Sequence, residues 1–438
     1  MKFNELSKVS LLNAAFLFAS SLVQAELPMV SPEEVGFDSD KLEAIIERAD
    51  SVYEAGLIPN YVIALAKDGK MFFKASRGNR TIGTDSPVGL DTLYPLASMS
   101  KPIASSAIFH LIEQGKLSLN SELREFYPEF DSMLVAENGS LDAQFEEASR
   151  PITILDLLSH TGGIEYGASI SGVGDVAELY DEIGLINGCL SAAENMELLA
   201  QLPLVAQPGE KWNYSVSTDI LGAVIEKVAG MSLGEYAAAN ILEPIGITDS
   251  AWKHSDQRLS SKYATLYNPP LNGQVAIGQS GNEGINWRLS ESDRYSACPV
   301  GSTQRIFDMG GSGLVGTATD YLAYATMIAN QGEFNGTRVL SEESVKTQTT
   351  QQVPTAEVRG LGEVFGENLF GAGFGIAFSE ENPDEVDYYY WGGSNNTGFA
   401  IDPLDGAVAV QMSSCYRCQQ FMMVDIEQIM DDARITTD

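Results

Sequence analysis

Histidine is scarce in this chain, whose 438 residues include only three: His110, His160 and His254. A hydrolase that uses the Ser-His-Asp triad needs a histidine base held by a carboxylate. His110 falls inside an apolar helical run, His160 in a Leu-Leu-Ser-His-Thr-Gly-Gly motif and His254 in a polar loop, so we interpret all three as structural. A zinc site is not expected either, because no histidine lies near a cysteine in the sequence.

Cysteine is almost as rare, with only Cys189, Cys298, Cys415 and Cys418. Four cysteines are too few for a disulfide scaffold, but their even number suits bridges in an exported protein. Three pairings are open, and one of them joins Cys415 to Cys418 locally and leaves Cys189 with Cys298. A catalytic redox pair is disfavoured, since the surroundings lack the strand-to-helix context of such motifs.

Basic residues are few relative to acidic ones, with 26 Lys and Arg against 60 Asp and Glu, and the formal net charge is -34. Such a surface repels the phosphate backbone of nucleic acids. We therefore expect no nucleic-acid partner.

Long hydrophobic runs are absent except near the N-terminus, where Lys2 and Lys8 precede an apolar segment at residues 11–23. The segment closes with Val23-Gln24-Ala25, the layout of a secretory signal peptide. It is too short and too polar for a membrane span. We therefore expect residues 1–25 to be removed and the mature protein to be periplasmic or secreted, without stable membrane insertion.

Apolar periodicity predicts an α+β fold. A helix is expected at residues 38–55, followed by strands at 61–66 and 71–75 that are joined by an Asp68-Gly69 turn. Strand patterns return late in the chain, at residues 374–378, 388–391, 399–402 and 407–412, before a helix at 419–433.

This order predicts one antiparallel sheet built from strands of both chain ends, flanked by helices and interrupted by a largely helical insertion. We assign residues 26–438 to one unit. Its α/β part comprises residues 26–115 and 305–438, and its mainly helical part is about 116–304.

The stretch Ser98-Met99-Ser100-Lys101 places a hydroxyl and an amine three residues apart at the start of an apolar helical run. Residues at this spacing share a helix face, so Lys101 is expected to lie beside Ser98 and activate it as a nucleophile. Pro102 is compatible with a first helical turn, where its missing N–H is not needed.

A competing Gly-x-Ser-x-Gly match occurs at Gly230-Met231-Ser232-Leu233-Gly234. The nucleophile elbow of an α/β-hydrolase requires a buried strand before this motif. The apolar positions at 220–228 have helical spacing instead, and Gly230 is typical of a helix stop. We therefore reject Ser232 as a nucleophile.

The base must come from another residue type, and a tyrosine paired with an amine can serve when proximity to the amine lowers the pKa of the tyrosine and partial burial lowers that of the amine. The candidate is Tyr214, in Trp212-Asn213-Tyr214-Ser215-Val216. The preceding Pro208-Gly209-Glu210 turn would deliver Tyr214 from a loop onto the start of the next helix.

Five pieces of sequence, in order and at domain-scale separations, together resemble the serine β-lactamase and penicillin-binding-protein superfamily on its class C branch. They are Leu93-Tyr94-Pro95-Leu96-Ala97-Ser98-Met99-Ser100-Lys101-Pro102, Leu157-Leu158-Ser159-His160-Thr161-Gly162-Gly163, Pro208-Gly209-Glu210-Lys211-Trp212-Asn213-Tyr214-Ser215, Gly313-Leu314-Val315-Gly316-Thr317-Ala318-Thr319-Asp320 and Trp391-Gly392-Gly393. The resemblance implies Ser98 as nucleophile, Lys101 as its activator and Tyr214 as general base and acid. It also implies an oxyanion hole formed by the N–H groups of Ser98 and Ser394, and no metal or cofactor.

Two departures from the family pattern concern substrate binding. Trp391-Gly392-Gly393 stands where lactamases and carboxypeptidases carry Lys-Thr-Gly, and Val216 stands where they carry Asn. The lost lysine would have held a substrate carboxylate by charge. With these changes the chain resembles the family VIII carboxylesterases most, and the resemblance implies that Trp391, Gly392, Gly393 and Val216 contact an uncharged substrate.

The reaction implied is cleavage of short-acyl or small aromatic esters through an acyl-enzyme on Ser98. A hydrolase of amides, D-amino-acid peptides or β-lactams is the alternative, because the same three residues serve it. A non-catalytic envelope-binding protein is a third reading, disfavoured by the intact Ser98, Lys101 and Tyr214. The sequence leaves the oligomeric state and the natural substrate open.

Overall fold

The computed structural model describes residues 25, 27–142, 144–168, 172, 174–183, 188–252, 261–269, 288–289, 306–353, 358–359, 369–379, 382, 385–418 and 423–435. Of the expected leader at residues 1–25, the structure describes only Ala25. His254 also lies outside the described residues. No helix of the described part is both long and apolar enough to cross a membrane.

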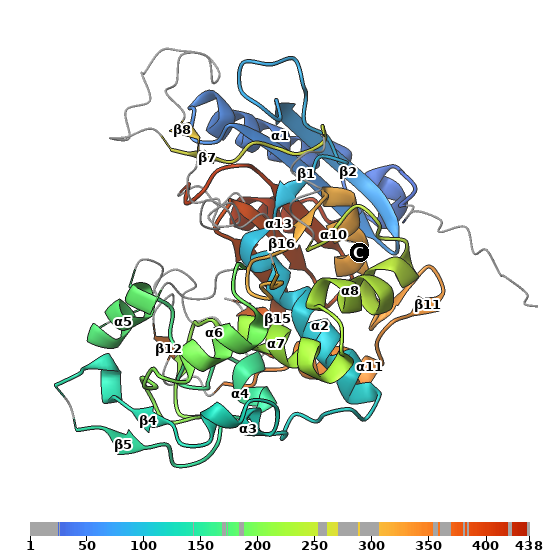
Figure 1. Cartoon of the computed structure of the whole chain (residues 1–438). Helices are drawn as coiled ribbons and strands as arrows, with labels where there is room; N and C mark the ends of the chain where they lie inside the picture. The colour runs from blue at the N-terminus through green and yellow to red at the C-terminus, as the bar shows by residue number, and fades with distance from the viewer. Residues whose placement is uncertain are drawn as a thin grey trace, which may run out of the picture.

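A seven-stranded antiparallel sheet forms the centre of the molecule (Figure 1). Its order is β13-β14-β15-β16-β17-β1-β2, so strands from the two ends of the sequence meet where β1 pairs with β17, with Val62 opposite Met412. The strands are β1 (Asn60–Lys67), β2 (Lys70–Gly78), β13 (Leu369–Phe370), β14 (Gly375–Phe378), β15 (Val386–Gly393), β16 (Thr397–Ile401) and β17 (Val408–Met412). The predicted α+β class and the assembly of the sheet from both ends are confirmed.

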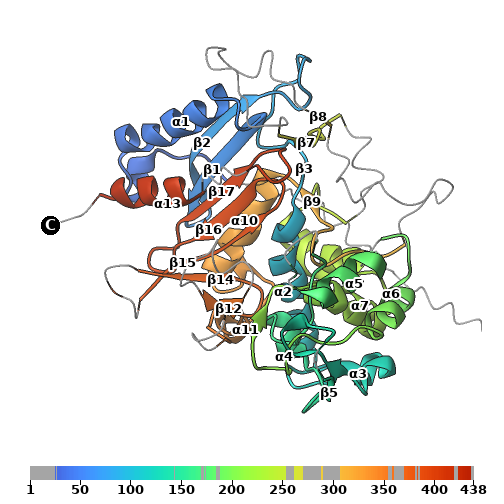
Figure 2. The same ribbon diagram turned by 90° about the vertical axis from the view of Figure 1, so that its left-hand side faces the viewer.

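Two layers of helices cover the sheet, one on each face (Figure 2). Along β1 the side chains alternate, as a strand buried on both faces requires. Ile63 and Leu65 join the core beneath α1 (Ser39–Glu54) and α13 (Met423–Asp432), and Val62 and Ala64 join the core that includes α2 (Ser100–Glu113) and α10 (Ala318–Ala329). The face bearing α2 is the one that carries the candidate site.

Local sequence signals account for the N-terminal elements. The Asp38 side chain accepts hydrogen bonds from the Asp40 and Lys41 N–H groups and so caps α1 at its predicted start. The turn between β1 and β2 has positive φ at both Asp68 (53°) and Gly69 (71°), the backbone shape that an Asp-Gly hairpin favours.

The segment from residue 116 to 304 was predicted to be mainly helical, and its described part is more broken than that. Its helices are α3 (Leu123–Phe126), α4 (Ile154–Leu158), α5 (Asp175–Ile183), α6 (Ala192–Leu199), α7 (Ser217–Ala229), α8 (Leu233–Ala237), 3-10 turns at Pro128–Phe130, Glu137–Gly139 and Glu243–Ile245, and a π-turn at Ala238–Leu242. Two-residue strands also occur in this segment: β4 (Leu134–Val135) pairs with β5 (Glu146–Glu147) between α3 and α4, and β7 (Tyr267–Asn268) pairs with β8 (Arg288–Leu289) after the last of these helices. Short helices with long connections lack the sustained periodicity that a sequence pattern detects.

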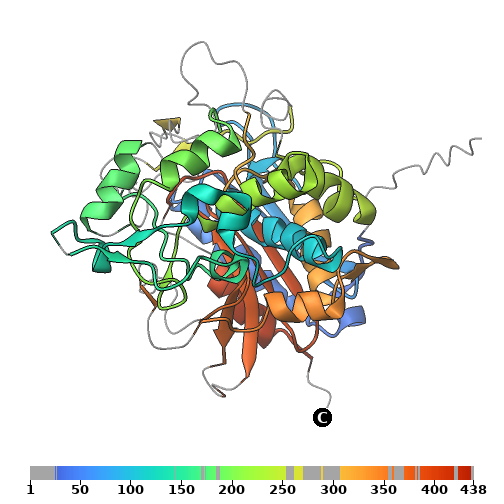
Figure 3. The same ribbon diagram turned by 60° about the horizontal axis from the view of Figure 1, so that its bottom comes forward.

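The buried helix α2 connects this segment to the sheet. It packs against α7, α8 and α11 (Glu342–Gln348), and Figure 3 shows these helices gathered around it. All its residues from Ser100 to Phe109 are buried, which agrees with the apolar run that predicted an interior helix. Three further short pairs complete the fold: β3 (Tyr94–Pro95) with β9 (Val315–Gly316), β6 (Trp212–Asn213) with β12 (Val358–Arg359), and β10 (Glu333–Phe334) with β11 (Thr337–Arg338).

One disulfide joins Cys415 to Cys418, so the local bridge considered from the sequence is formed. Cys298, to which Cys189 was assigned in that arrangement, lies outside the described residues.

Candidate active site

Ser98 lies in a single 3-10 turn, Ala97–Met99, that leads directly into α2. The strand before it, β3, is tied to β9, and the Leu96 N–H donates to the Leu314 carbonyl at 2.9 Å. The side chain of Ser100 fixes the turn from the other side, because it donates to the Ala97 carbonyl at 2.6 Å and accepts from the Leu314 N–H at 2.9 Å. Ser98 is thus half-buried at the start of a helix, as its sequence position predicted.

The residue before the candidate nucleophile has an unusual backbone. Ala97 has φ 49°, in the left-handed region that costs a residue with a side chain roughly 1–2 kcal/mol. Such conformations persist only where the surrounding structure fixes them. Here the hydrogen bonds of Leu96 and Ser100 to Leu314 supply that restraint.

Lys101 is fully buried, and its ammonium group has three hydrogen-bond acceptors. Nζ donates to the Gly311 carbonyl at 2.7 Å, to the Tyr166 hydroxyl at 3.1 Å and to Ser98 Oγ at 3.3 Å. An ammonium group has three donors, so these acceptors match its capacity. The i, i+3 spacing read from the sequence therefore does bring the Lys101 amine to the Ser98 hydroxyl.

Tyr214 approaches Ser98 from the connection between β6 and α7. Its hydroxyl donates to Ser98 Oγ at 2.8 Å, and its ring is buried with 6% exposed. The Lys101 ammonium lies 4.8 Å from the centre of the Tyr214 ring, over its face. The sequence interpretation paired Lys101 with Tyr214 by proximity; in the structure the amine contacts the π-face of the ring and donates its hydrogen bonds to three other groups.

Tyr166 is the site residue that the sequence reasoning missed. It accepts from Lys101, and its ring centre lies 5.2 Å from that of Tyr214. It follows the Leu-Leu-Ser-His-Thr-Gly-Gly motif by three residues, and Gly163 in that motif has a positive φ of 72°. The motif just before Tyr166 was the sequence feature that could have pointed to it. No fixed spacing from Ser98 or Lys101 distinguishes this tyrosine from the others among the 17 in the chain.

Gly311 was also missed, because it acts through its backbone. Its carbonyl accepts from Lys101 while its N–H donates to Asp219 Oδ1 at 2.9 Å. A Cβ at position 311 would lie 2.5 Å from Asp219 Oδ2, so only glycine fits this approach to α7. Asp219 therefore fixes a carbonyl that in turn orients Lys101.

An aromatic wall surrounds the Tyr214 ring. The Trp391 ring centre lies 5.5 Å from Tyr214 and 5.0 Å from Phe370, and Trp212 stacks on Tyr214 at 6.0 Å. Val216 is 2% exposed and precedes the first residue of α7. The predicted substrate-contact residues Trp391 and Val216 are thus both placed in the core around the tyrosine rather than on the surface.

Of the three histidines the structure describes His110 and His160, and each of these hydrogen-bonds to a residue other than Ser98. His160 is buried behind Tyr214, with ring centres 5.0 Å apart, and its Nδ1 hydrogen-bonds to Ser215 Oγ at 3.0 Å. Burial and then the nearby Lys101 charge hold the pKa of His160 well below its usual value, so the imidazole is neutral. His110 of α2 hydrogen-bonds through Nδ1 to the Tyr236 hydroxyl of α8 at 2.8 Å.

The segment Gly392-Gly393-Ser394 ends β15 and turns beside Ala97–Met99. A Cβ at Gly393 would meet the Leu96 carbonyl at 2.3 Å, which explains the glycine at this close approach. Asn395 Nδ2 donates to the Pro95 carbonyl at 2.8 Å and Thr397 Oγ1 to the Leu96 carbonyl at 3.1 Å. These bonds attach the turn that carries Ser394 to the segment that carries Ser98.

Ser232, in the rejected Gly-x-Ser-x-Gly match, has a structural role. It is the N-cap of α8, where its side chain accepts from the Glu235 N–H, and Gly230 ends α7 in a left-handed conformation with φ 71°. No buried strand precedes it, since the preceding element is α7. The helical interpretation of this motif is confirmed.

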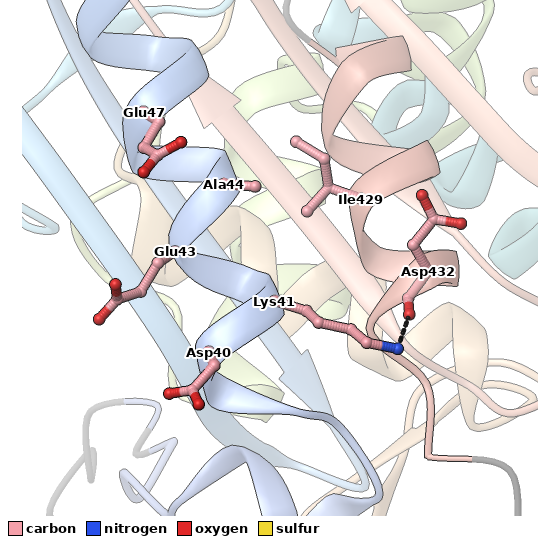
Figure 4. Close-up of a pocket in the computed structure, with 7 residues that line it drawn as sticks. All are labelled: Asp40, Lys41, Glu43, Ala44, Glu47, Ile429 and Asp432. Atoms are coloured by element: carbon pink, nitrogen blue, oxygen red, sulfur yellow. Dashed lines mark hydrogen bonds between the residues drawn. The ribbon is translucent and has the colours of Figure 1, made fainter.

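The structure also has a pocket that is not lined by Ser98, Lys101 or Tyr214. The pocket of Figure 4 lies between α1 and α13, on the sheet face opposite α2, and is lined by Asp40, Lys41, Glu43, Ala44, Glu47, Ile429 and Asp432. Its lysine donates to the Asp432 carbonyl at 2.8 Å. Among the residues that the structure describes, no group of three or more His, Cys, Asp or Glu side chains is placed to hold a metal ion.

Comparison with known proteins places this geometry in a family. Residues 44–430 match the Beta-lactamase family. Protein Rv1367c of Mycobacterium tuberculosis is 31% identical over 369 residues, covering 80% of this chain and 84% of that protein. Esterase EstB of Burkholderia gladioli is 28% identical over 388 residues, covering 85% and 90%.

A solved structure, EstCE1, a hydrolase with promiscuous acyltransferase activity, aligns with a TM-score of 0.68 at 22% identity and covers 89% of this chain and 98% of its own. At that identity the likeness concerns the fold. The family match spans most of the chain and agrees with the motifs around Ser98, Lys101 and Tyr214. The chain therefore belongs to the Beta-lactamase family of serine hydrolases and their relatives.

Proposed function

We propose that this protein is a serine carboxylesterase in which Ser98 is the nucleophile, Lys101 its activator and Tyr214 the general base and acid. The observation that carries the proposal is the convergence of Ser98 and Lys101, three residues apart, with Tyr214, which is 116 positions from Ser98. Ser98 Oγ lies 2.8 Å from the Tyr214 hydroxyl and 3.3 Å from Lys101 Nζ. The esterase relative EstB supports the same chemistry.

Acylation begins when Ser98 Oγ attacks the ester carbonyl carbon. The Ser98 proton passes to Tyr214 in its phenolate form, and Tyr214 then donates that proton to the departing alkoxide. The Lys101 ammonium lies over the face of the Tyr214 ring, where a cation is attracted to the ring electrons. The products of this step are an alcohol and an acyl ester on Ser98.

Deacylation repeats the route with water. Tyr214 takes a proton from the attacking water, the acyl group leaves Ser98 as a carboxylic acid, and the proton returns to Ser98 Oγ. The neutral His160 behind Tyr214 takes no part in this proton transfer, because its Nδ1 faces Ser215. One phenol thus serves both half-reactions.

The tetrahedral oxygen needs two donors, and we assign them to the N–H groups of Ser98 and Ser394. Ser98 stands at the start of α2, where amide groups point out of the helix and its dipole favours negative charge. The Gly393 position allows the turn of Ser394 to lie against the Ser98 segment. Preorganised donors of this kind commonly give the largest single contribution to acyl-transfer catalysis.

The substrate wall is apolar. Trp391 occupies the place of a family lysine and packs on Tyr214, and Gly392 and Gly393 continue its strand. With Val216 these residues offer no cation to a substrate carboxylate. Their apolar character favours uncharged short-acyl or small aromatic esters as substrates. D-amino-acid peptides and β-lactams are disfavoured because they carry a carboxylate.

We also infer that residues 1–25 direct export to the periplasm or outside the cell. The charge layout of the leader and the Cys415–Cys418 bridge support an oxidising compartment. Fractionation of cells that express the full chain, with N-terminal sequencing of the product, tests this inference. A cytoplasmic product that retains Met1 would contradict it.

The activity is tested with p-nitrophenyl butyrate, nitrocefin and a D-Ala-D-Ala peptide on the purified protein and its Ser98→Ala variant. We expect turnover of the ester that Ser98→Ala abolishes, and much slower turnover of the other two compounds. Ser232→Ala is the matched control, since it removes a half-buried serine hydroxyl that caps a helix. Ester turnover that survives Ser98→Ala would defeat the assignment, and preferential turnover of nitrocefin or the peptide would favour the alternative.

A further inference from the structure

The loop after β17 is closed by the Cys415–Cys418 disulfide and lies directly against the turn of Ser394. The Arg417 N–H donates to the Ser394 carbonyl at 2.7 Å, and the Cys415 N–H donates to the Asn395 carbonyl at 3.2 Å. Two residues inside the bridged loop thus hold two consecutive carbonyls of the turn.

The bridged loop is itself firmly anchored. Both cysteines are buried, Cys415 fully and Cys418 with 4% exposed. The Tyr416 N–H donates to the Tyr267 carbonyl at 2.8 Å, and the Tyr267 N–H donates to the Ser414 carbonyl at 3.0 Å. Ser414 Oγ also accepts from Asn60 Nδ2 at 2.8 Å, which connects the loop to the first residue of β1. The loop is therefore a fixed platform and not a free tail.

These contacts determine where the Ser394 N–H points. A peptide group is planar, so the Ser394 N–H and the Gly393 carbonyl share one plane. The Gly393 carbonyl accepts from the Asn396 N–H at 2.9 Å, and the Ser394 carbonyl, in the next plane, accepts from Arg417. Both peptide planes that flank the Ser394 α-carbon are held by hydrogen bonds, one from within the turn and one from the bridged loop.

The bridge is needed because the loop conformation is strained. Arg417 has φ 54°, in the left-handed region, although it carries a long and exposed side chain. An L-residue leaves this region readily when nothing holds it, with a gain of roughly 1–2 kcal/mol. Rotation of the Arg417 backbone would turn its N–H away from the Ser394 carbonyl. The cross-link of Cys415 to Cys418 spans Arg417 and opposes that rotation.

We propose that the Cys415–Cys418 bridge is a positioning device that fixes the Ser394 N–H for the oxyanion of the acyl-transfer transition state. This inference rests on the proposed esterase function and deepens it, since it adds a covalent support to the donor turn. A donor aimed at the tetrahedral oxygen stabilises the transition state more than the planar ester. Loss of the bridge should therefore lower kcat and leave KM nearly unchanged.

The test uses the complete chain with Cys415→Ser and Cys418→Ser combined. Removal of one oxyanion donor costs about 10²- to 10³-fold in kcat, so a donor that is loosened but retained should cost roughly 10-fold to 100-fold. We expect the affinity for a trifluoromethyl ketone, whose adduct on Ser98 carries the same oxyanion, to fall by a similar factor. Titration of active sites with a fluorophosphonate corrects both values for any unfolded fraction.

Reduction of the folded wild-type protein with a phosphine provides the matched comparison, and it also serves if the double variant does not fold. Reduction should lower the kcat of the wild type and leave that of the double variant unchanged, because the other cysteines are present in both. An unchanged kcat per titrated site in the double variant or in the reduced wild type would overturn the inference. If the wild type shows no Ser98-dependent ester turnover, the proposed function fails instead.

Discussion

The replacement Tyr214→Phe isolates one oxygen atom of the proposed mechanism. Phenylalanine retains the ring that contacts Trp391 at 5.5 Å and His160 at 5.0 Å, and it retains the π-face beneath the Lys101 ammonium. Among the residues that the structure describes, the Tyr214 hydroxyl has one hydrogen bond, the 2.8 Å bond to Ser98 Oγ. The variant therefore removes that bond and the proton-transfer group, and it leaves the packing intact.

The expected loss can be estimated from these contacts. General acid–base catalysis contributes about 10²- to 10⁴-fold, which at about 1.36 kcal/mol per decade raises the barrier by roughly 2.7–5.4 kcal/mol. One neutral hydrogen bond contributes only about 0.5–1.5 kcal/mol to stability. The variant should therefore fold, bind the ester with a similar KM and lose most of its kcat.

The assay measures kcat and KM on p-nitrophenyl butyrate, together with the thermal unfolding midpoint, for the wild type, Tyr214→Phe and Tyr166→Phe. Tyr166→Phe is the matched control, because it removes a neighbouring phenol oxygen that contacts Lys101 instead of Ser98. We expect it to lower the free energy of unfolding by roughly 1–3 kcal/mol, the cost of leaving a buried donor of Lys101 unsatisfied, and to lower kcat less than Tyr214→Phe does. A larger loss in Tyr166→Phe than in Tyr214→Phe would refute the roles assigned to the two tyrosines.

Three further predictions concern the surroundings of the site and the stability of the fold. Gly393→Ala should lower kcat at least tenfold, because its Cβ would lie 2.3 Å from the Leu96 carbonyl and displace the donor turn; wild-type kinetics in this variant would contradict the close approach. Asp156→Ala should lower the free energy of unfolding by about 2–3 kcal/mol in a urea titration, since the buried carboxylate accepts from the Thr153 N–H and from Arg150, and a loss below about 0.5 kcal/mol would argue against that role. Burial, followed by the charges of Asp387 and Asp431, raises the pKa of Glu427 to about 8. Between about pH 4.5 and pH 8 the native state therefore keeps a proton that the unfolded chain has released. The free energy of unfolding consequently falls as the pH rises through this range. Glu427→Gln should be more stable than the wild type at pH 9 and similar at pH 4, and an equal difference at both pH values in urea titrations would contradict the shifted pKa.

The sequence predicted the elements with strong local signals. The apolar run at residues 61–66, the Asp68-Gly69 turn and the late strands were sufficient for an antiparallel sheet built from both ends, and the structure has these strands at nearly the same positions. Ser98 and Lys101 lie close together because the spacing within a single turn determines the distance. Tyr214 was proposed from the turn that precedes it and then from the family resemblance, because no spacing rule connects a tyrosine to a serine 116 positions away.

The remaining parts of the site depend on long-range or backbone contacts. The Gly311 carbonyl and the Tyr166 hydroxyl reach Lys101 from separate segments, and a backbone oxygen has no residue type that reveals it. The position of the Lys101 ammonium over the Tyr214 ring follows from these two acceptors, which draw the amine away from the phenolic oxygen. The left-handed backbone of Ala97 was also unpredictable, since alanine carries no preference for it. Packing against residues around position 314 imposes that conformation.

The pairing of β1 with β17 has a consequence for how the enzyme is made. The edge of β1 that faces β17 is filled only when residues 408–412 have been synthesised, so an incomplete nascent chain exposes an unpaired strand of mostly apolar side chains. Contacts between such distant segments slow folding, because a long loop must close before they form. We expect chains truncated before Val408 to aggregate or to be degraded, and ester turnover to appear only after release from the ribosome.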